Sequence, residues 1–328
     1  MRVLIIAPNQ SRKWNWGHQH LRNEFAAYCE VVYYGAGFAH KGNPNISEVV
    51  EELGPFDAIL TWDQTYCGYF NSIKELDIPK AVFLVDYVPS VGKADKNDEF
   101  MRKHEFDYAF LRSTYIYELF CHRKKQGRIP EKTKPVLLPF GVNTALYDDF
   151  GHERDYDVCA IFSMVSWAYP RRAALIEAVN AMAGITVMAG GHSGKGKIVH
   201  EAYINAINRS KMFINSNGTY KAVLMKYFEA MACRTLLITD KPTDADLMGF
   251  MDGENIVFYN NIQDAVAKIR YYKDNPKERF RIANNGYRLV HTFHGNDKRV
   301  KQVLEVMSGK GESLNGIGYS FQPKNLKV

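Results

Sequence analysis

The sequence has few cysteines and no long hydrophobic run. Its five cysteines among 328 residues show no C-x-x-C spacing, which argues against a disulfide framework and against a zinc site. No stretch approaches the roughly 20 apolar residues of a transmembrane helix, and the apolar run after Met1 is too short for a signal peptide. We therefore expect a cytoplasmic protein without a transmembrane segment, whose cysteines are reduced and buried.

The glycine-rich stretch MAGGHSGKGKIV, which begins at Met188, lacks one residue that a Walker A loop needs. That motif requires Ser or Thr after its Gly-Lys pair, but Ile198 follows Gly196 and Lys197. Isoleucine cannot ligate the magnesium ion that bridges the terminal phosphates of a nucleotide. The ATPase interpretation is therefore rejected, although glycines after an apolar strand still suit the close approach of an anion.

Charge is present in only modest excess. A formal net charge of +6 favours an anionic partner without identifying a nucleic-acid binder. The densest basic stretch is CHRKKQGRIPEKTK, which begins at Cys121. It suits contact with phosphate, peripheral contact with an anionic surface, or a solvated helix end, and we favour the solvated helix end.

Short apolar, β-branched runs recur along the chain between helical patterns, which indicates parallel sheets covered on both faces. The runs are VLIIA, EVVYYG, DAILTW, AVFLVD, DYAFLR and PVLLPFG, then YDVCAIFS, ITVMAG, SKMFINS, TLLITD and NIVFY. We predict two Rossmann-like α/β domains, residues 1–145 and 146–305, facing each other across a cleft lined by strand-to-helix loops. Residues 306–328 are expected to form a tail that packs back or is loosely held.

The segment NSNGTYKAVLMKYFEAMACRTLLITD resembles the C-terminal signature of GT-B glycosyltransferases, close to family 4 and closer still to the CgeB-like branch of group 1. The resemblance continues to about Leu304 and includes LPFGVNTALY upstream. It implies a GT-B fold and a retaining enzyme that moves a hexosyl or pentosyl unit from a nucleoside-diphosphate sugar, expected to be a UDP-sugar, to a hydroxyl acceptor. It also implies that the enzyme uses neither a metal nor a permanently bound cofactor.

Glu229 is the residue on which this interpretation depends most. It falls off the apolar helical stripe formed by Leu224, Tyr227, Phe228 and Met231. A carboxylate there can accept hydrogen bonds from both ribose hydroxyls, while a helix N-terminus near residues 216–221 offers free N–H groups to a diphosphate. By residue type alone Glu229 is an ordinary exposed helix glutamate, whereas the motif favours ribose binding.

Two positions depart from the family pattern. Lys221 stands where the family has the glutamate that contacts the sugar, and an ammonium cannot accept hydrogen bonds from hydroxyls. This substitution keeps open a catalytically inactive nucleotide-sugar-binding module. Arg234 stands where the family has a glycine in a tight turn.

Further donor contacts follow from the resemblance. Arg171, Arg172 and Lys226 are expected to neutralise the leaving diphosphate, although a solvated helix face is an equal alternative for Arg172. The other expected donor-binding residues are Gly17, Gly190, Gly191, Asn217, Gly218, Thr219, Tyr220 and Lys221.

In the first domain, Asp63 and Asp86 end apolar runs and are expected at the cleft. The resemblance gives Asp86 the role of binding the transferred sugar or taking the acceptor proton, and we add Asp63 and His18 as candidate catalytic residues. For an isolated aspartate, a capping role is the ordinary alternative. Trp14 and Trp16 are expected to stack on the acceptor, with core packing as the alternative.

The sequence leaves the acceptor open. It can be a surface polymer, a glycan or a metabolite. As an alternative it is a hydroxymethylated base in DNA, as for phage DNA glycosyltransferases, with the basic surface following the phosphates. A nucleotide-sugar epimerase of the same architecture is a further alternative, because it needs no acceptor.

Overall fold

The structure, a computed structural model, describes residues 1–10, 17–67, 70–191 and 197–309. The chain divides into two compact units. Of the described residues, unit 1 contains 1–10, 18–139 and 299–309, and unit 2 contains Gly17 and 140–298. The last helix, α11 (Asn296–Met307), therefore begins in unit 2 and ends in unit 1.

Among the described residues, unit 1 forms a six-stranded parallel sheet in the order β2-β1-β3-β4-β5-β6. Its strands are β1 (Arg2–Ile6), β2 (Glu30–Tyr34), β3 (Ala58–Trp62), β4 (Lys80–Leu84), β5 (Tyr108–Leu111) and β6 (Lys134–Leu137). Every residue of β3 and β4 is buried, as expected for central strands covered on both faces. The six apolar runs predicted from the first half of the sequence are confirmed as strands.

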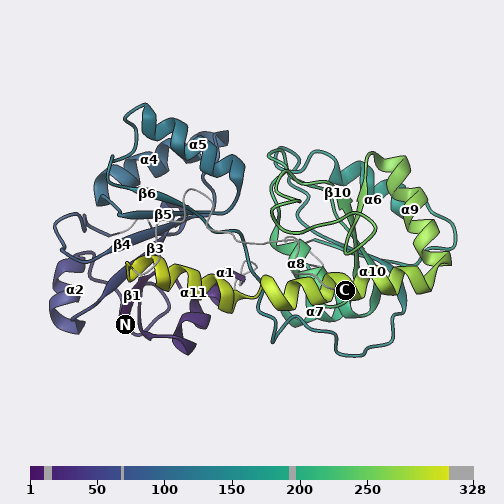
Figure 1. Ribbon diagram of the computed structural model, residues 1–328, viewed down its shortest axis with the longest axis horizontal. Coiled ribbons are helices and arrows are strands. Elements are labelled where there is room, and N and C mark those ends of the chain that lie inside the picture. Colours follow the sequence, from purple (N-terminus) through teal and green to yellow (C-terminus); the bar gives the residue numbers. More distant parts are fainter. Residues whose placement is uncertain (11–16, 68–69, 192–196, 310–328) are drawn as a thin grey trace. The chain divides into compact units, whose positions relative to one another are not determined.

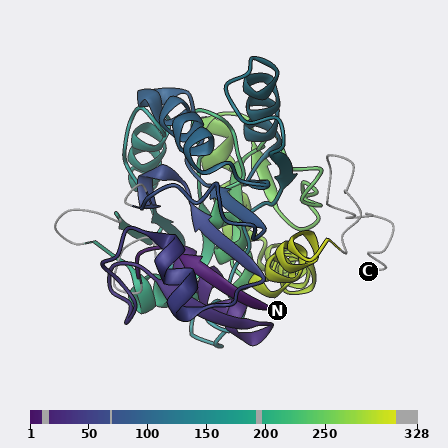
Figure 2. The same cartoon turned by 90° about the vertical axis from the view of Figure 1, so that its left-hand side faces the viewer.

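Helices connect these strands. They are α1 (Gly17–Glu24), α2 (Ile46–Leu53), α3 (Gln64–Cys67), α4 (Lys93–His104) and α5 (Thr114–Lys125). Helices α4 and α5 lie together on one side of the sheet in Figure 1, and Figure 2 shows them on the same side from a second direction. Because every neighbouring pair of strands is parallel, the loops that follow the strands collect at one edge of the sheet.

Unit 2 repeats this plan with five described strands in the order β11-β10-β9-β7-β8. The strands are β7 (Tyr156–Ile161), β8 (Val187–Gly190), β9 (Ser210–Ile214), β10 (Leu236–Asp240) and β11 (Val257–Tyr259). The helices are α6 (Arg172–Asn180), α7 (His200–Asn208), α8 (Met225–Ala232), α9 (Ile262–Asp274) and α10 (Pro276–Phe293). The five runs predicted from the second half of the sequence are also confirmed as strands.

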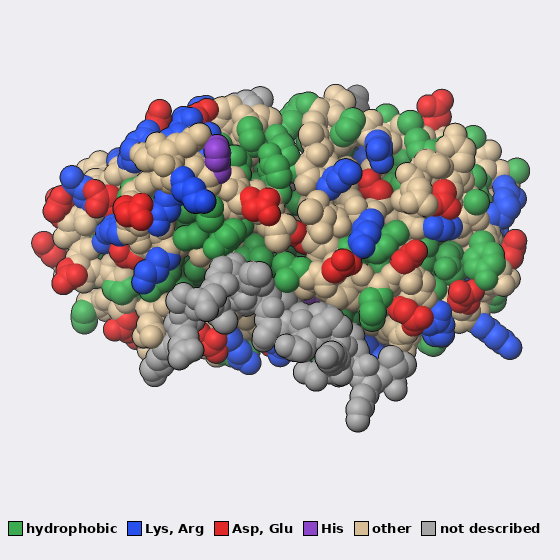
Figure 3. Space-filling view, turned by 45° about the horizontal axis from the view of Figure 1, so that its top comes forward, with side chains coloured by type: hydrophobic (Ala, Val, Ile, Leu, Met, Phe, Trp, Pro, Cys, Tyr) green, Lys and Arg blue, Asp and Glu red, His purple; other side chains and the backbone are tan. Residues whose placement is uncertain are grey.

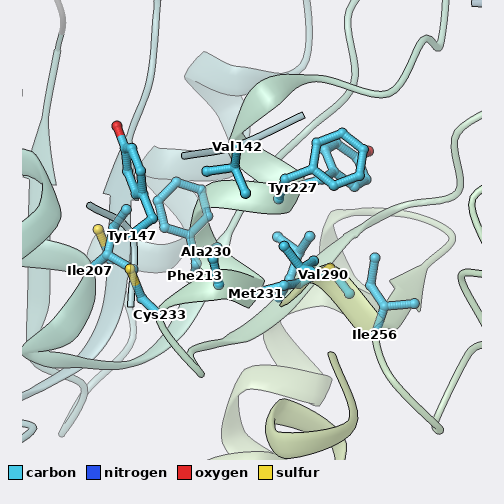
Figure 4. Close-up of a cluster of buried hydrophobic side chains, with 14 of the residues drawn as sticks. Val142, Tyr147, Ile207, Phe213, Tyr227, Ala230, Met231, Cys233, Ile256 and Val290 are labelled. Atoms are coloured by element: carbon cyan, nitrogen blue, oxygen red, sulfur yellow. The ribbon is translucent and has the colours of Figure 1, made fainter. Parts of the chain in front are cut away.

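The core of unit 2 lies on both faces of its sheet. Along β7, Val158 and Ala160 belong to one buried cluster while Cys159 and Ile161 belong to the other, which is the two-residue alternation of a strand. Figure 4 shows the second cluster, in which side chains of α8 pack with Phe213 of β9 and its neighbours. Burying one such aromatic or aliphatic side chain contributes about 1.5–3 kcal/mol.

Helix α8 begins at Met225, after Leu224 in an extended conformation. The expectation that its free N–H groups lie near residues 216–221 is therefore wrong by several residues. Lys221 has a φ of 48°, a left-handed conformation that cannot start an α-helix. The loop thus reaches the helix through an extended segment, and its backbone bonds to other segments: the N–H of Thr219 donates to the carbonyl of Ala168, and the N–H of Thr243 donates to the carbonyl of Lys221.

Candidate functional site

Each unit has one point at which its strand order reverses. In unit 2 this point lies between the adjacent strands β7 and β9, and in unit 1 between β1 and β3. Ligands of doubly wound α/β sheets bind beyond the carboxyl ends of the strands at such points. In unit 2 the loops that follow are residues 162–171 and 215–224.

Arg172 fastens the two loops of unit 2 together. Its guanidinium donates to the carbonyl of Ser163 at 2.9 Å, to the carbonyl of Ser216 at 3.2 Å and to Oδ1 of Asn215 at 3.1 Å. It also lies 3.5 Å from the ring centroid of Tyr169. Arg172 is only 1% exposed, so the interpretation as a solvated surface arginine is wrong. Burial lowers its pKa to about 10, which leaves it charged at neutral pH.

Arg171 differs from Arg172 in its exposure and in its contacts. Its side chain is 59% exposed, and its Nη1 lies 3.8 Å from Oδ2 of Asp240 at the end of β10. At that distance the contact with Asp240 is a loose ion pair rather than a hydrogen bond. Of the two adjacent arginines, Arg171 is therefore the one with donors directed outside the protein framework.

The 216–221 loop is held by backbone and side-chain bonds. The N–H of Asn217 donates to Oδ1 of Asp240 at 2.7 Å, and its Nδ2 donates to the Asp240 carbonyl at 2.9 Å. Thr219 Oγ1 donates to the carbonyl of Trp167 at 2.8 Å. A Cβ on Gly218 would lie 3.0 Å from the carbonyl oxygen of Ala168, so glycine permits the close approach of the two loops.

Of the other expected donor residues, Tyr220 and Lys221 belong to the 216–221 loop, whereas Gly190 and Gly191 lie at the end of β8. Tyr220 is half-buried and Lys221 is exposed. Gly190 ends β8, where a Cβ would lie 2.7 Å from Cδ1 of Ile198, and Gly191 accepts a backbone hydrogen bond from Ile198 at 3.0 Å. These two glycines therefore pack against Ile198.

Glu229 belongs to a buried polar group on α7 and α8. It is 8% exposed, so the interpretation as an exposed helix glutamate is wrong. The hydroxyl of Tyr203 donates to Oε2 of Glu229 at 2.8 Å, and Nζ of Lys226 donates to the same hydroxyl at 3.1 Å. Burial raises the pKa of Glu229 and lowers that of Lys226 to about 8. Tyr203 thus connects a carboxylate to an ammonium group.

Sequence reasoning missed Tyr203. It lies 26 residues before Glu229 in a stretch whose pattern predicts only an amphipathic helix. Arg172 lowers the pKa of Lys226 further, which shows that the polar group and the fastened loops share one electrostatic environment. Unit 2 therefore holds a buried carboxylate and an ammonium group on the two sides of one hydroxyl.

In unit 1, polar side chains also collect after the strands. Oδ2 of Asp63, after β3, accepts from the backbone N–H of Asp86, after β4, at 2.8 Å, and its Oδ1 accepts from Thr65 N at 3.2 Å. Asp63 is completely buried, and burial together with the charge of Asp86 raises its pKa to about 6. It therefore positions the Asp86 backbone and is itself shielded from solvent.

Asp86 forms an ion pair that the sequence did not reveal. Nζ of Lys93, at the start of α4, lies 2.8 Å from its Oδ2, and both side chains are about one-third exposed or less. His18 of α1 is buried, and burial followed by the charge of Arg22 lowers its pKa to about 4, so it is neutral at pH 7. The charge of Asp86 acts in the opposite direction and raises that pKa.

The remaining expected residues of the first domain are partly outside the described residues. Gly17 is the first residue of α1. Trp14 and Trp16 lie outside the described residues. Their assignments stay predictions.

The basic stretch after Cys121 is largely neutralised within unit 1. Arg123 pairs with Asp98 and, at 2.5 Å, with Asp95, to which Arg128 also pairs at 2.5 Å. Lys124 Nζ donates to the carbonyl of Thr133 at 3.0 Å. On the face shown in Figure 3, acidic side chains lie among the basic ones. The favoured interpretation, a helix end rather than a binding surface for a polyanion, agrees with these contacts.

The described residues offer neither a metal site nor a membrane-spanning helix. They contain no group of three or more His, Cys, Asp or Glu side chains arranged to hold a metal ion. None of their helices is long and apolar enough to cross a membrane.

Comparison with known proteins identifies the fold. Residues 171–305 match the model of a family described as glycosyl transferase-like, and no curated protein matches the chain. The structure of HepE from Anabaena in complex with UDP-glucose is 14% identical, with a TM-score of 0.67 over 94% of this chain and 100% of that one. Sucrose-phosphate synthase from Thermosynechococcus elongatus is 11% identical, with a TM-score of 0.63 over 94% and 99%.

A glycosyltransferase from Rickettsia africae is similar as well, with 13% identity and a TM-score of 0.64 over 94% of this chain and 98% of that one. Likeness at these identities shows the fold, and it confirms the predicted α/β GT-B class with two Rossmann-like units. Membership of the CgeB-like branch stays a prediction.

Proposed function

We propose that the protein is a metal-independent glycosyltransferase that moves a hexosyl or pentosyl unit from a UDP-sugar to a hydroxyl acceptor. The observation that carries the proposal is the buried Glu229, whose carboxylate is bonded by Tyr203 next to the ammonium of Lys226. A buried carboxylate needs strong partners, and the 2′- and 3′-hydroxyls of a ribose are two donors that can join the hydroxyl of Tyr203. Lys226 and Arg171 then supply positive charge to the diphosphate.

Two further facts support this choice of donor. Residues 171–305, which match the glycosyl transferase-like family, include Arg171, Lys226 and Glu229. The HepE structures from Anabaena contain UDP, glucose or UDP-glucose. The donor loops at the switch point of unit 2 are fastened by Arg172 before any ligand arrives, so little ordering entropy is lost on binding.

We assign binding of the acceptor to unit 1. Asp86 is a partly exposed carboxylate beside an ammonium group, and in this proposal it binds the transferred sugar or takes the proton of the attacking hydroxyl. Asp63, which is buried and bonded to the backbone of Asp86, is then a positioning residue rather than the base. The acceptor is a polymer, glycan or metabolite. We do not favour DNA, because the arginines of the basic stretch pair with Asp95 and Asp98.

The test is UDP binding by Glu229→Gln, with Glu201→Gln as the matched control. Glu201 is an exposed glutamate of α7, so its replacement removes the same charge without touching the buried group. A hydrogen bond to a charged group contributes about 1.5–3 kcal/mol, so we expect Glu229→Gln to weaken UDP binding about 10- to 100-fold. Glu201→Gln should bind like the wild type, and circular dichroism should show all three proteins folded.

Transfer assays then separate the alternatives. Release of UDP from a panel of UDP-sugars with EDTA present, abolished in Glu229→Gln, is the expected result. Equal UDP binding by both variants would contradict the proposal. UDP binding without any release would favour an inactive binding module, and conversion of the free nucleotide sugar without release of UDP would favour an epimerase.

A further inference from the structure

A small cavity lies in unit 1 next to the ion pair of Asp86 and Lys93. It has a volume of about 320 Å³ and is lined by Gln64, Thr65, Lys93 and Lys96. Gln64 and Thr65 directly follow Asp63 at the end of β3, while Lys93 and Lys96 lie in the first turn of α4. The volume is at the lower limit of ligand pockets, so the cavity suits a small group or one end of a larger ligand.

Hydrogen bonds fix the walls of this cavity. The N–H of Gln64 donates to Oδ1 of the buried Asn97 at 3.0 Å, and Nδ2 of Asn97 donates to the carbonyl of Lys93 at 3.0 Å. The N–H of Thr65 donates to Oδ1 of Asp63 at 3.2 Å. Helices α3 and α4 are thus joined through one amide side chain, so the two lysines project from a fixed support.

The cavity carries positive charge. Lys93 and Lys96 are three residues apart and therefore share one face of α4. Lys93 is neutralised by Asp86, whereas Lys96 is exposed and has no hydrogen bond or ion pair to the described residues. No acidic residue lines the cavity. Asp95, which precedes Lys96 in the sequence, pairs with Arg123 and Arg128.

We infer that this cavity binds an anionic group of the acceptor, a phosphate or a carboxylate carried near the hydroxyl that receives the sugar. The inference rests on the proposed function, since it takes Asp86 as the group that the hydroxyl approaches. Lys96 donates charge-assisted hydrogen bonds to the anion. Lys93, which already holds Asp86, lies between the carboxylate and the anion and reduces their mutual repulsion.

The first experiment measures binding of inorganic phosphate to the full-length protein by calorimetry in saturating UDP, which blocks the diphosphate site of unit 2. Wild-type protein should bind phosphate weakly but measurably. Lys96→Gln should weaken that binding about tenfold, because one charge-assisted partner is lost. Lys125→Gln, which replaces an exposed lysine of α5 outside the cavity, should leave it unchanged.

The second experiment compares acceptor probes that differ only in charge. Glycerol 3-phosphate is compared with glycerol, and methyl glucuronide with methyl glucoside, in transfer from UDP-sugars. The charged member of at least one pair should be the better acceptor, and that preference should fall in Lys96→Gln. The pair that shows the preference identifies phosphate or carboxylate as the anion.

Two results would overturn the inference. One is absence of phosphate binding in saturating UDP, and the other is an equal loss in Lys96→Gln and Lys125→Gln. Because phosphate binding is measured in saturating UDP, failure of the anion site can be told apart from failure of the proposed function. If UDP itself does not bind, the proposed donor is wrong; if UDP binds and phosphate does not, only the anion site is wrong.

Discussion

Replacing each of the adjacent arginines Arg171 and Arg172 by methionine should have opposite effects. The Arg172 variant should lose stability, and the Arg171 variant should lose affinity for UDP. Methionine keeps most of the length of arginine but none of its donors. In Arg172→Met, the carbonyls of Ser163 and Ser216 and Oδ1 of Asn215 lose their partner. In Arg171→Met, the change removes only an exposed charge that lies 3.8 Å from Asp240.

The magnitude follows from the contacts of Arg172. Three hydrogen bonds to a charged donor contribute about 1.5–3 kcal/mol each. Burial lowers the pKa of Arg172 to about 10, so the substitution also relieves a desolvation cost that offsets part of this loss. We therefore expect unit 2 of Arg172→Met to lose about 2–5 kcal/mol of unfolding free energy. Arg171→Met should change it by less than about 0.5 kcal/mol.

Urea denaturation followed by circular dichroism measures the free energy of unfolding of each variant. Calorimetric titration measures its affinity for UDP. Arg171→Met should keep the wild-type midpoint and bind UDP about five- to tenfold more weakly, because it loses one charge-assisted contact with the diphosphate. An unchanged midpoint in Arg172→Met would refute the assignment of this residue to the framework. A larger loss of stability in Arg171→Met would reverse the assignment.

Two more predictions concern the buried polar group. Tyr203→Phe removes the hydroxyl between Lys226 and Glu229, so UDP binding in calorimetric titrations should weaken several-fold. UDP affinity should also fall as the pH rises through about 8, because burial lowers the pKa of Lys226 to about 8 and only the protonated amine attracts the diphosphate. Titrations from pH 6 to 10 should show this fall in the wild type but not in Lys226→Arg, whose side chain stays charged; the same fall in both proteins would assign it to another group.

The strands were predictable because each is a continuous apolar run. A central strand of a parallel sheet is buried on both faces, so it leaves a strong signal in the sequence. The start of α8 was less predictable, because the left-handed conformation of Lys221 depends on the partners of the loop and not on its composition.

Contacts between distant residues account for most of what the sequence did not show. Arg171 and Arg172 are indistinguishable by type and position, and only the path of the β9 loop decides which of them is buried. Lys93 and Tyr203 belong to no motif. The cations after Cys121 formed the densest basic stretch in the sequence, yet the carboxylates of Asp95 and Asp98 that neutralise them come from another helix.

The departures from the family pattern have a structural cause in one case. Arg234, which stands where the pattern has a glycine, has a φ of 52° and lies just after the end of α8. The N–H of the next residue, Thr235, donates to the carbonyl of Ala230 at 3.1 Å. This is the usual position for a left-handed glycine at a helix end. The Nε of Arg234 lies 3.2 Å from Oδ2 of Asp149, and its guanidinium lies 4.4 Å from the ring centroid of Tyr287. These contacts offset the cost of the left-handed backbone conformation, about 1–2 kcal/mol.

The two units share a strand order but differ in the chemistry at their switch points. In unit 2, Glu229 and Lys226 share the hydroxyl of Tyr203 and Arg171 is exposed; in our proposal these three residues hold an anion bearing a ribose. In unit 1, a buried carboxyl holds the backbone of Asp86, and Lys93 pairs with its side chain. A group fixed in this way is suited to a proton or a hydroxyl rather than to a nucleotide. In the proposed function, the common topology therefore sets where each unit binds its substrate, and the residues that follow the strands set which substrate it binds.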